Sequence, residues 1–213
     1  MYRILIALLA FTWPSVSFSE GPTGRFVVEG EVLFFNTYVA DKEEEEEIID
    51  EDLEAFKSVL KENPAVKRLT LTSWGGLISV AKDISDLVID YGLDTNVMGD
   101  CSSACTIIFL GGKNRTVEKG SKVGFHKSNW AAESIENYYA ENKAFFGWKS
   151  PFEFAEWVHE DSQNDVFMDL EYLVERGVES RFAIKTLNTD SDDMWYPRRS
   201  ELEAAGVIRV GLE

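Results

Sequence analysis

The sequence predicts a single α/β domain, and three observations lead to this prediction. Residues 66–73 alternate as a strand, enter a double glycine and continue as an amphipathic helix. A second short strand, 95–98, leads through small residues into an apolar helical run that ends at Leu110. Hydrophobic residues make up 45% of the chain, which is enough to build a core. Strands that alternate with helices in this way form crossover units, with the helices packed on a sheet.

The other elements follow in chain order. Residues 26–35 predict an opening strand bent at Gly30. Apolar residues at helical spacing then predict a helix that ends before Pro64. Further short strands are predicted at 116–117 and 122–126.

An aromatic-rich helical segment covers about residues 131–187. Aromatic side chains at this density are typical of a core or of a groove or subunit contact, and we expect mainly core. The glutamate run 43–47 is typical of a solvated loop or helix start.

The N-terminal segment 1–19 has the layout of a secretory signal peptide. A basic start at Arg3 precedes an eight-residue apolar core, and small residues favour cleavage after Ser19. The alternative is an uncleaved N-terminal anchor. We therefore expect residues 20–213 to form one domain with no stable membrane span, located in the periplasm or secreted from a bacterium.

The charge of the chain excludes several partners. The formal net charge is −17, which disfavours nucleic acid and any polybasic contact with a membrane. Neither a dinucleotide-binding glycine pattern nor a lysine-bearing phosphate loop is present, so no nucleotide cofactor is expected. Two cysteines and a distant histidine do not predict a metal site.

Ser103 is the candidate nucleophile. It lies among small residues just before the apolar helix, where free backbone N–H groups favour developing negative charge. Serine in this position is also typical of an ordinary helix cap. The surroundings favour catalysis, because a glycine turn lies upstream and a strand ending on His126 lies downstream.

His126 is the candidate general base, which would take the proton of Ser103 and return it to the leaving group. His159, on an amphipathic helical stretch, is expected to be structural. A serine–lysine dyad through Lys122 or Lys127 is the alternative, but His126 holds the better position.

Three short motifs give the chain a resemblance to a known family. Residues 73–76 (SWGG), 101–105 (CSSAC) and 124–126 (GFH) resemble the core motifs of the Clp protease proteolytic-subunit family, in the crotonase superfamily. The match is closest to secreted, periplasmic members and covers about 26–130 and 188–210. The resemblance implies a ClpP/crotonase-type α/β fold, with repeated ββα units and helices packed around the sheets.

The resemblance also implies the remaining site residues. The backbone N–H groups of Gly76 (or Gly75) and Ala104 would form an oxyanion hole, for which glycine allows close approach of the substrate. Asp193, with Asp192 as the alternative, would orient the histidine. The chain departs from the family at Trp74, where a proline is usual, and in a C-terminal spacing about one residue longer.

Cys101 and Cys105 flank the candidate serine. Their spacing on a helix start puts the Cα atoms about 6 Å apart, near the limit for a disulfide. Export makes that bond chemically possible, and it would rigidify the turn that carries Ser103. The alternative is two small buried thiols packed in the core.

The sequence therefore predicts an exported serine hydrolase, expected to be a peptidase acting on a peptide or protein substrate without cofactor or metal. One alternative is a catalytically inactive member of the same fold that binds or scaffolds. Acyl-CoA chemistry, which uses the same oxyanion hole in this superfamily, is disfavoured by export. A homo-oligomer is compatible with the resemblance, but the assembly state and the cleavage preference do not follow from the sequence.

Overall fold

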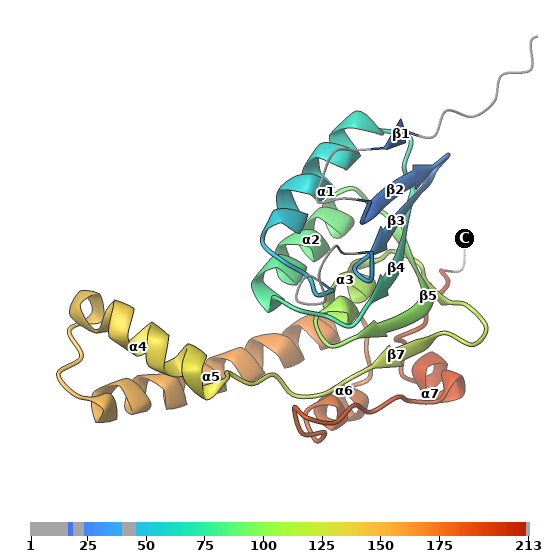
Figure 1. The fold of residues 1–213 in the computed structure, drawn as a ribbon. Helices are drawn as coiled ribbons and strands as arrows, with labels where there is room; N and C mark the ends of the chain where they lie inside the picture. The colour runs from blue at the N-terminus through green and yellow to red at the C-terminus, as the bar shows by residue number, and fades with distance from the viewer. Residues whose placement is uncertain (1–16, 19–23, 40–45, 212–213) are drawn as a thin grey trace, which may run out of the picture.

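The computed structural model describes residues 17–18, 24–39 and 46–211. It has an α/β fold, as predicted, in which helices pack around one sheet (Figure 1). The strands follow the order β1-β2-β3-β4-β5-β6, and β7 also pairs with β5. Their bounds are β1 Ser17–Phe18, β2 Phe26–Glu29, β3 Val32–Asn36, β4 Arg68–Ser73, β5 Asp94–Ser102, β6 Arg115–Val117 and β7 Lys122–Gly124.

The opening strand differs from the prediction. Residues 26–36 form an antiparallel hairpin of two strands, β2 and β3, rather than one bent strand. Gly30, at the turn, has φ 63°, a left-handed conformation that glycine adopts without steric cost. Leu33 and Phe35 are fully buried, so the hairpin places alternate residues of β3 in the core.

The central strand β5 is longer than predicted and pairs with two strands on one side. Its first part, Thr95–Val97, lies parallel to β6, and its second part, Asp100–Ser102, lies parallel to β7. On its other side β5 pairs with β4, with an irregular register near Ser73. The ends of β4, β5 and β7 therefore meet at one edge of the sheet, and all three predicted motifs lie there.

Seven helices are described, with bounds α1 Glu51–Glu62, α2 Ile78–Asp90, α3 Cys105–Gly111, α4 Ala132–Phe146, α5 Pro151–Glu175, α6 Ser180–Thr186 and α7 Arg199–Ala204. Helices α1 and α2 lie side by side against the sheet, and α3 packs against α2 and β5 (Figure 1). The hydrophobic core lies between these helices and the sheet, and it includes the fully buried Phe56, Ile84 and Phe109.

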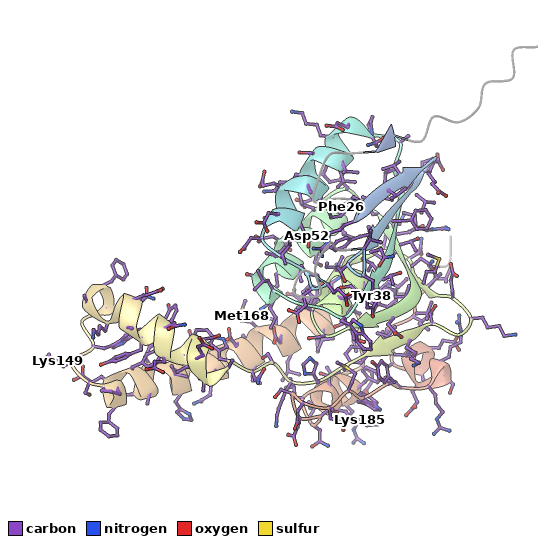
Figure 2. The ribbon with its side chains drawn as sticks, viewed as in Figure 1. Phe26, Tyr38, Asp52, Lys149, Met168 and Lys185 are labelled. Atoms are coloured by element: carbon purple, nitrogen blue, oxygen red, sulfur yellow. A yellow bond between two sulfur atoms is a disulfide. The ribbon has the colours of Figure 1, made fainter. Side chains whose placement is uncertain are left out.

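The hairpin part of the aromatic segment, α4 and most of α5, does not form part of this core, contrary to our expectation, whereas Leu173, Val178, Phe182 and Ala183 near its end do. Helices α4 and α5 form a hairpin that extends away from the sheet, with Lys149 at its far end and Met168 near the body (Figures 1 and 2). No residue of α4 is buried, and the aromatic rings pack mainly on one another, with Trp148 contacting Tyr138 and Trp157. Phe145 and Phe152 are each 85% exposed. The hairpin is too far from the sheet for its rings to enter the core.

Arg115 joins three distant parts of the chain. Its guanidinium is buried and donates hydrogen bonds to the backbone carbonyls of Leu110, Arg176, Gly206 and Val207. Burial lowers the pKa of Arg115 to about 10, so the group is still charged at pH 7. It therefore holds the end of α3, the end of α5 and the C-terminal turn together.

Most of the predicted signal segment lies outside the described residues, as does most of the glutamate run. The part that is described, Ser17–Phe18, pairs with Val27–Val28 of β2. In the parts of the chain that the structure describes, no helix has the length and apolar character needed to cross a membrane.

Candidate active site

Ser103 lies in a tight turn between β5 and α3. Its φ is 53°, and among the described residues it is the only one other than glycine with a positive φ. A non-glycine residue in this conformation typically costs about 1–3 kcal/mol, so surrounding contacts must hold it. The Ser103 amide donates to the carbonyl of Gly124 at 3.0 Å, and the Ser103 carbonyl accepts from the amide of Thr106 at 2.9 Å. The turn is thus fixed to β7 and to the first turn of α3.

The structure brings the two main candidates together. His126 Nε2 lies 2.7 Å from Ser103 Oγ, within hydrogen-bond distance. His126 follows β7 directly, and β7 pairs with the end of β5, so the two side chains leave neighbouring strands. This is the geometry that a serine and its general base require.

The other nitrogen of His126 has a different environment. Nδ1 is buried and has no side-chain partner among the described residues, and the backbone of Ser191 lies beside it. Burial lowers the pKa of His126, and the neighbouring backbone of Ser191 opposes this shift. The imidazole is therefore neutral at pH 7, which is the state that can accept the proton of Ser103.

The structure does not bring Asp193 to His126. The Asp193 carboxylate is exposed and accepts a hydrogen bond from the amide of Met194 at 2.7 Å, and Asp192 is also exposed. The loop that carries both is nevertheless adjacent to the histidine. Lys127 donates its amide to Thr189, and Phe125 pairs with Trp195.

Residues 190–194 therefore form a loop opposite His126, between these two anchor points. The expected contact between the Asp193 carboxylate and His126 is not formed in the structure. The physical reason is that the exposed Asp193 side chain accepts a hydrogen bond from the amide of the next residue, Met194.

The double glycine after β4 lies directly against the Ser103 turn. A Cβ atom on Gly75 would lie 2.7 Å from Ser103 Cβ and 3.0 Å from the amide nitrogen of Ala104. Gly75 and Gly76 have φ of 115° and 135°, conformations that side chains rarely adopt. Only glycine allows the two turns to approach this closely.

The hydrogen bonds of this turn distinguish the two glycines. The Gly75 amide donates to Ser73 Oγ at 3.1 Å, and the Gly75 carbonyl accepts from Ile48. Gly76 lies opposite Ile48 in a parallel bridge, and the two hydrogen bonds of this bridge are formed by the neighbours of Gly76, Gly75 and Leu77. The N–H of Gly76 itself therefore points away from Ile48. The N–H of Gly76 is therefore better placed than that of Gly75 to bind an oxyanion. The sequence did not show the role of Ser73, although a serine before a glycine turn is a recognisable signal.

A small apolar cavity of about 80 Å³ opens beside Ser103, Ala104 and His126. Its apolar lining comes from α2, α3, the end of α5 and the residues that follow β7 and α6, and consists of Ile78, Ile107, Leu110, Phe125, Leu173 and Leu187. A larger hollow of about 820 Å³ begins at Gly76 and continues along α4 and α5. The sequence did not indicate that these residues line a cavity, because apolar residues at helical spacing are expected to lie in the core.

Tyr172 anchors the end of α5 at this cavity. Its hydroxyl lies 2.6 Å from Ser85 Oγ and donates to the carbonyl of Ile107 at 2.8 Å. These contacts join α5 to α2 and α3. The hairpin therefore contributes to the site through its inner end, although its outer end lies far away.

Both alternative lysines are engaged elsewhere. Lys127 forms an ion pair with Asp190 at 2.5 Å, and Lys122 lies over the ring of Tyr196. His159 is exposed on α5 and contacts Gln163. Within the residues that the structure describes, no group of three or more His, Cys, Asp or Glu side chains could hold a metal ion.

Cys101 and Cys105 form a disulfide, with a Cα–Cα distance of 5.3 Å. This resolves the choice that the sequence left open between a disulfide and two buried thiols. Both cysteines are fully buried.

Comparisons with known proteins give a distant likeness to solved structures. No protein-family model matches the chain, and no curated protein matches it. Among solved structures, a mutant of ClpP1 from Listeria monocytogenes is similar with a TM-score of 0.49 and 16% identity, over 76% of this chain and 84% of that chain. A likeness this distant assigns neither a family nor an activity, so the chemistry of the site follows from its own residues.

Proposed function

We propose that this protein is an exported serine hydrolase that cleaves peptide bonds in the periplasm or outside the cell. The observation that carries the proposal is the 2.7 Å contact between Ser103 Oγ and His126 Nε2, at a turn where the serine has a left-handed backbone. A neutral histidine beside a serine hydroxyl is the arrangement that activates serine as a nucleophile.

In the proposed mechanism, Ser103 Oγ attacks the carbonyl carbon of a peptide bond while His126 Nε2 takes its proton. The oxyanion that forms would accept hydrogen bonds from the amides of Gly76 and Ala104. His126 then donates the proton to the leaving amine, and water hydrolyses the acyl-enzyme by the same steps. The apolar cavity beside Ser103 would hold the side chain of the acyl residue, and the larger hollow would hold the extended peptide.

The third member of the proposed triad is Asp193. The buried Nδ1 of His126 has no side-chain partner among the described residues, and the backbone of Ser191 is the group that acts on it. A small change in the loop 190–194 on substrate binding would bring a carboxylate to this atom, where its charge would stabilise the imidazolium.

Export is proposed on two grounds. The N-terminal segment has the signal layout, and the buried disulfide is of a kind that forms and persists in oxidising compartments. The acidic net charge of −17 is compatible with either a periplasmic or a secreted location.

A fluorophosphonate probe tests the proposal directly. Attack by Ser103 Oγ forms an O–P bond and expels fluoride, while His126 takes the proton. We expect covalent labelling at Ser103, none in Ser103→Ala, and a rate lower by about 10²–10⁴-fold in His126→Ala. The matched control is His159→Gln, which should label like the parent protein. Equal labelling of His126→Ala and the parent would overturn the proposed base.

A second candidate function is a catalytically inactive binding or scaffolding protein of the same fold. The buried Nδ1 of His126 favours it, because no carboxylate orients the imidazole in the structure. Folded protein that carries the disulfide and yet fails to label, in every assembly state and with a peptide ligand present, would support this candidate over the hydrolase.

A further inference from the structure

We propose that the Cys101–Cys105 disulfide positions the Ser103 nucleophile, so that the serine reaches its full reactivity only after the two thiols are oxidised. This inference rests on the proposed role of Ser103. It adds two positioning residues to the site and a chemical condition for activity.

The disulfide closes a short loop around the nucleophile. Cys101 lies near the end of β5, and Cys105 is the first residue of α3. Only Ser102, Ser103 and Ala104 lie between them. The covalent bond therefore joins the end of the strand to the start of the helix across the residues that carry the nucleophile and the proposed oxyanion donor.

The conformation of Ser103 needs such a constraint. Its φ of 53° is unfavourable for a residue with a side chain, so a free chain would leave this conformation. Backbone hydrogen bonds to Gly124 and Thr106 hold the turn from two sides. Without the disulfide, the distance between the end of β5 and the start of α3 would depend on these hydrogen bonds, on strand pairing with β4 and β7 and on packing against Gly75, none of which is covalent. A shift of the turn would move Ser103 Oγ away from His126 Nε2.

Because the two cysteines are buried, the disulfide must form during folding and cannot be reduced and reoxidised in the folded protein. Cys101 and Cys105 are both fully buried, so an external thiol cannot attack the bond in the folded protein. The thiols must instead be oxidised before or while the core closes. A molecule that folds in a reducing compartment would therefore keep a relaxed turn.

The oxidant that accepts the two electrons is an external disulfide. One cysteine thiolate attacks a sulfur of a small-molecule disulfide such as oxidised glutathione, or of an oxidoreductase disulfide, and forms a mixed disulfide. The second cysteine thiolate then attacks the protein sulfur of that mixed disulfide. The products are the Cys101–Cys105 bond and two thiols of the oxidant, which take up the two protons.

The test compares the oxidised protein with the double variant Cys101→Ala/Cys105→Ala. If the disulfide positions Ser103, the rate constant for fluorophosphonate labelling at saturating probe should fall by about 10–100-fold, because a misplacement of about 1 Å in a reacting group can cost 10²-fold. The probe concentration at half-saturation should change little. Wild-type protein refolded with dithiothreitol should behave like the double variant, and protein refolded with oxidised glutathione should behave like the native protein.

A matched control separates positioning from general stability. Val59→Ala removes buried methyl groups from α1, far from the site, and should lower thermal stability without slowing the labelling. Equal labelling rates in the folded double variant and the oxidised protein would overturn the inference.

A second readout distinguishes this inference from the proposed function. The ¹⁵N signals of His126, assigned by comparison with His126→Gln, report the hydrogen bond at Nε2 without any reaction. If no form labels, the proposed hydrolase fails. The positioning inference then still stands if the Nε2 signal differs between the oxidised protein and the double variant, and fails if the signals are the same.

Discussion

At the scale of single residues, the two nitrogens of His126 have opposite roles. Nε2 contacts the hydroxyl of Ser103, whereas Nδ1 is buried beside the loop 190–194 without a side-chain partner in the described part of the chain. The same burial that leaves Nδ1 without a side-chain partner disfavours the imidazolium, and so keeps the ring ready to accept a proton. The ring can therefore accept a proton at Nε2, and no carboxylate of the described residues contacts Nδ1.

The lowered pKa of His126 predicts how labelling depends on pH. As pH falls through this pKa, the imidazole takes up a proton and can no longer accept the one on Ser103. We therefore expect the labelling rate to decline on the acidic side with a midpoint below 6.5, the ordinary value for histidine. The measurement is the rate against pH, with His159→Gln as a control that should give the same midpoint.

The same shift has a consequence for stability. Below pH 6.5 the unfolded chain binds a proton at residue 126 more readily than the folded chain does, so the free energy of unfolding falls as pH decreases. If the labelling rate instead had its midpoint above pH 6.5, a negative charge would be acting on the imidazole, which would indicate a carboxylate at Nδ1.

Asp193 and Asp192 provide a direct test of the third site residue. Both carboxylates are exposed in the same loop. If Asp193 moves to Nδ1 in the reacting complex, Asp193→Asn should slow labelling by about 10⁴-fold, as expected for loss of the orienting carboxylate. Asp192→Asn is the matched control and should stay within about threefold of the parent. Unchanged labelling of Asp193→Asn would assign the orientation of His126 to the backbone of Ser191.

At the scale of elements, the site depends on the contact between two turns. The glycine turn after β4 and the serine turn after β5 come together because β4 and β5 are parallel neighbours, so their ends lie at the same edge of the sheet. The close approach of Gly75 to Ser103 leaves no room for a side chain. The glycine turn therefore supports the nucleophile as well as supplying the proposed oxyanion donor.

Gly75→Ala tests this contact. The added methyl would lie 2.7 Å from Ser103 Cβ and 2.9 Å from the carbonyl oxygen of Ser102, so one of the turns must shift. We expect labelling to slow by about 10²-fold or more. The control is Gly120→Ala, where φ is also positive at 90° but no atom lies within 4 Å of the new methyl. Equal effects of both variants on labelling would assign the loss to backbone conformation alone.

At the scale of the whole molecule, a few long-range contacts hold the site together. The loop that faces His126 and the C-terminal turn come from the last part of the chain, and the apolar cavity takes its far wall from α5. Arg115 fastens the ends of α3 and α5 and the C-terminal turn through four carbonyls. Distant segments therefore depend on one buried cation.

Arg115→Met should destabilise the fold strongly. The apolar side chain fills much of the space but leaves several buried carbonyls without donors, at a cost of about 3 kcal/mol or more. Urea denaturation measures this loss. Arg209→Met is the matched control, since Arg209 pairs with Arg115 through the backbone but is exposed, and the change should stay within about 0.5 kcal/mol. Similar losses in both variants would show that net charge, and not the buried hydrogen bonds, is responsible.

The sequence by itself determined the α/β class and the segments that meet at the site. Hydrophobic periodicity placed the helix after Gly76 and the short buried helix after Ser103, because these patterns are local and strong. The motifs around Gly76, Ser103 and His126 also predicted that these residues form one site, because a glycine turn, a serine at a helix start and a histidine are the parts that acyl transfer needs, and because the motifs resemble those of a known family. The aromatic segment was predicted as helical for the same local reason.

Only the tertiary structure decided the features that depend on contacts between distant residues. Periodicity could not place the aromatic rings, which pack on one another in the α4–α5 hairpin, because apolar spacing does not reveal what a helix faces. Spacing could not show that the Asp193 carboxylate turns outward, since a loop side chain has several rotamers of similar energy. The disulfide became certain only when the turn at Ser103 brought the two Cα atoms to 5.3 Å, because the left-handed backbone there differs from the regular helix on which the sequence estimate relied.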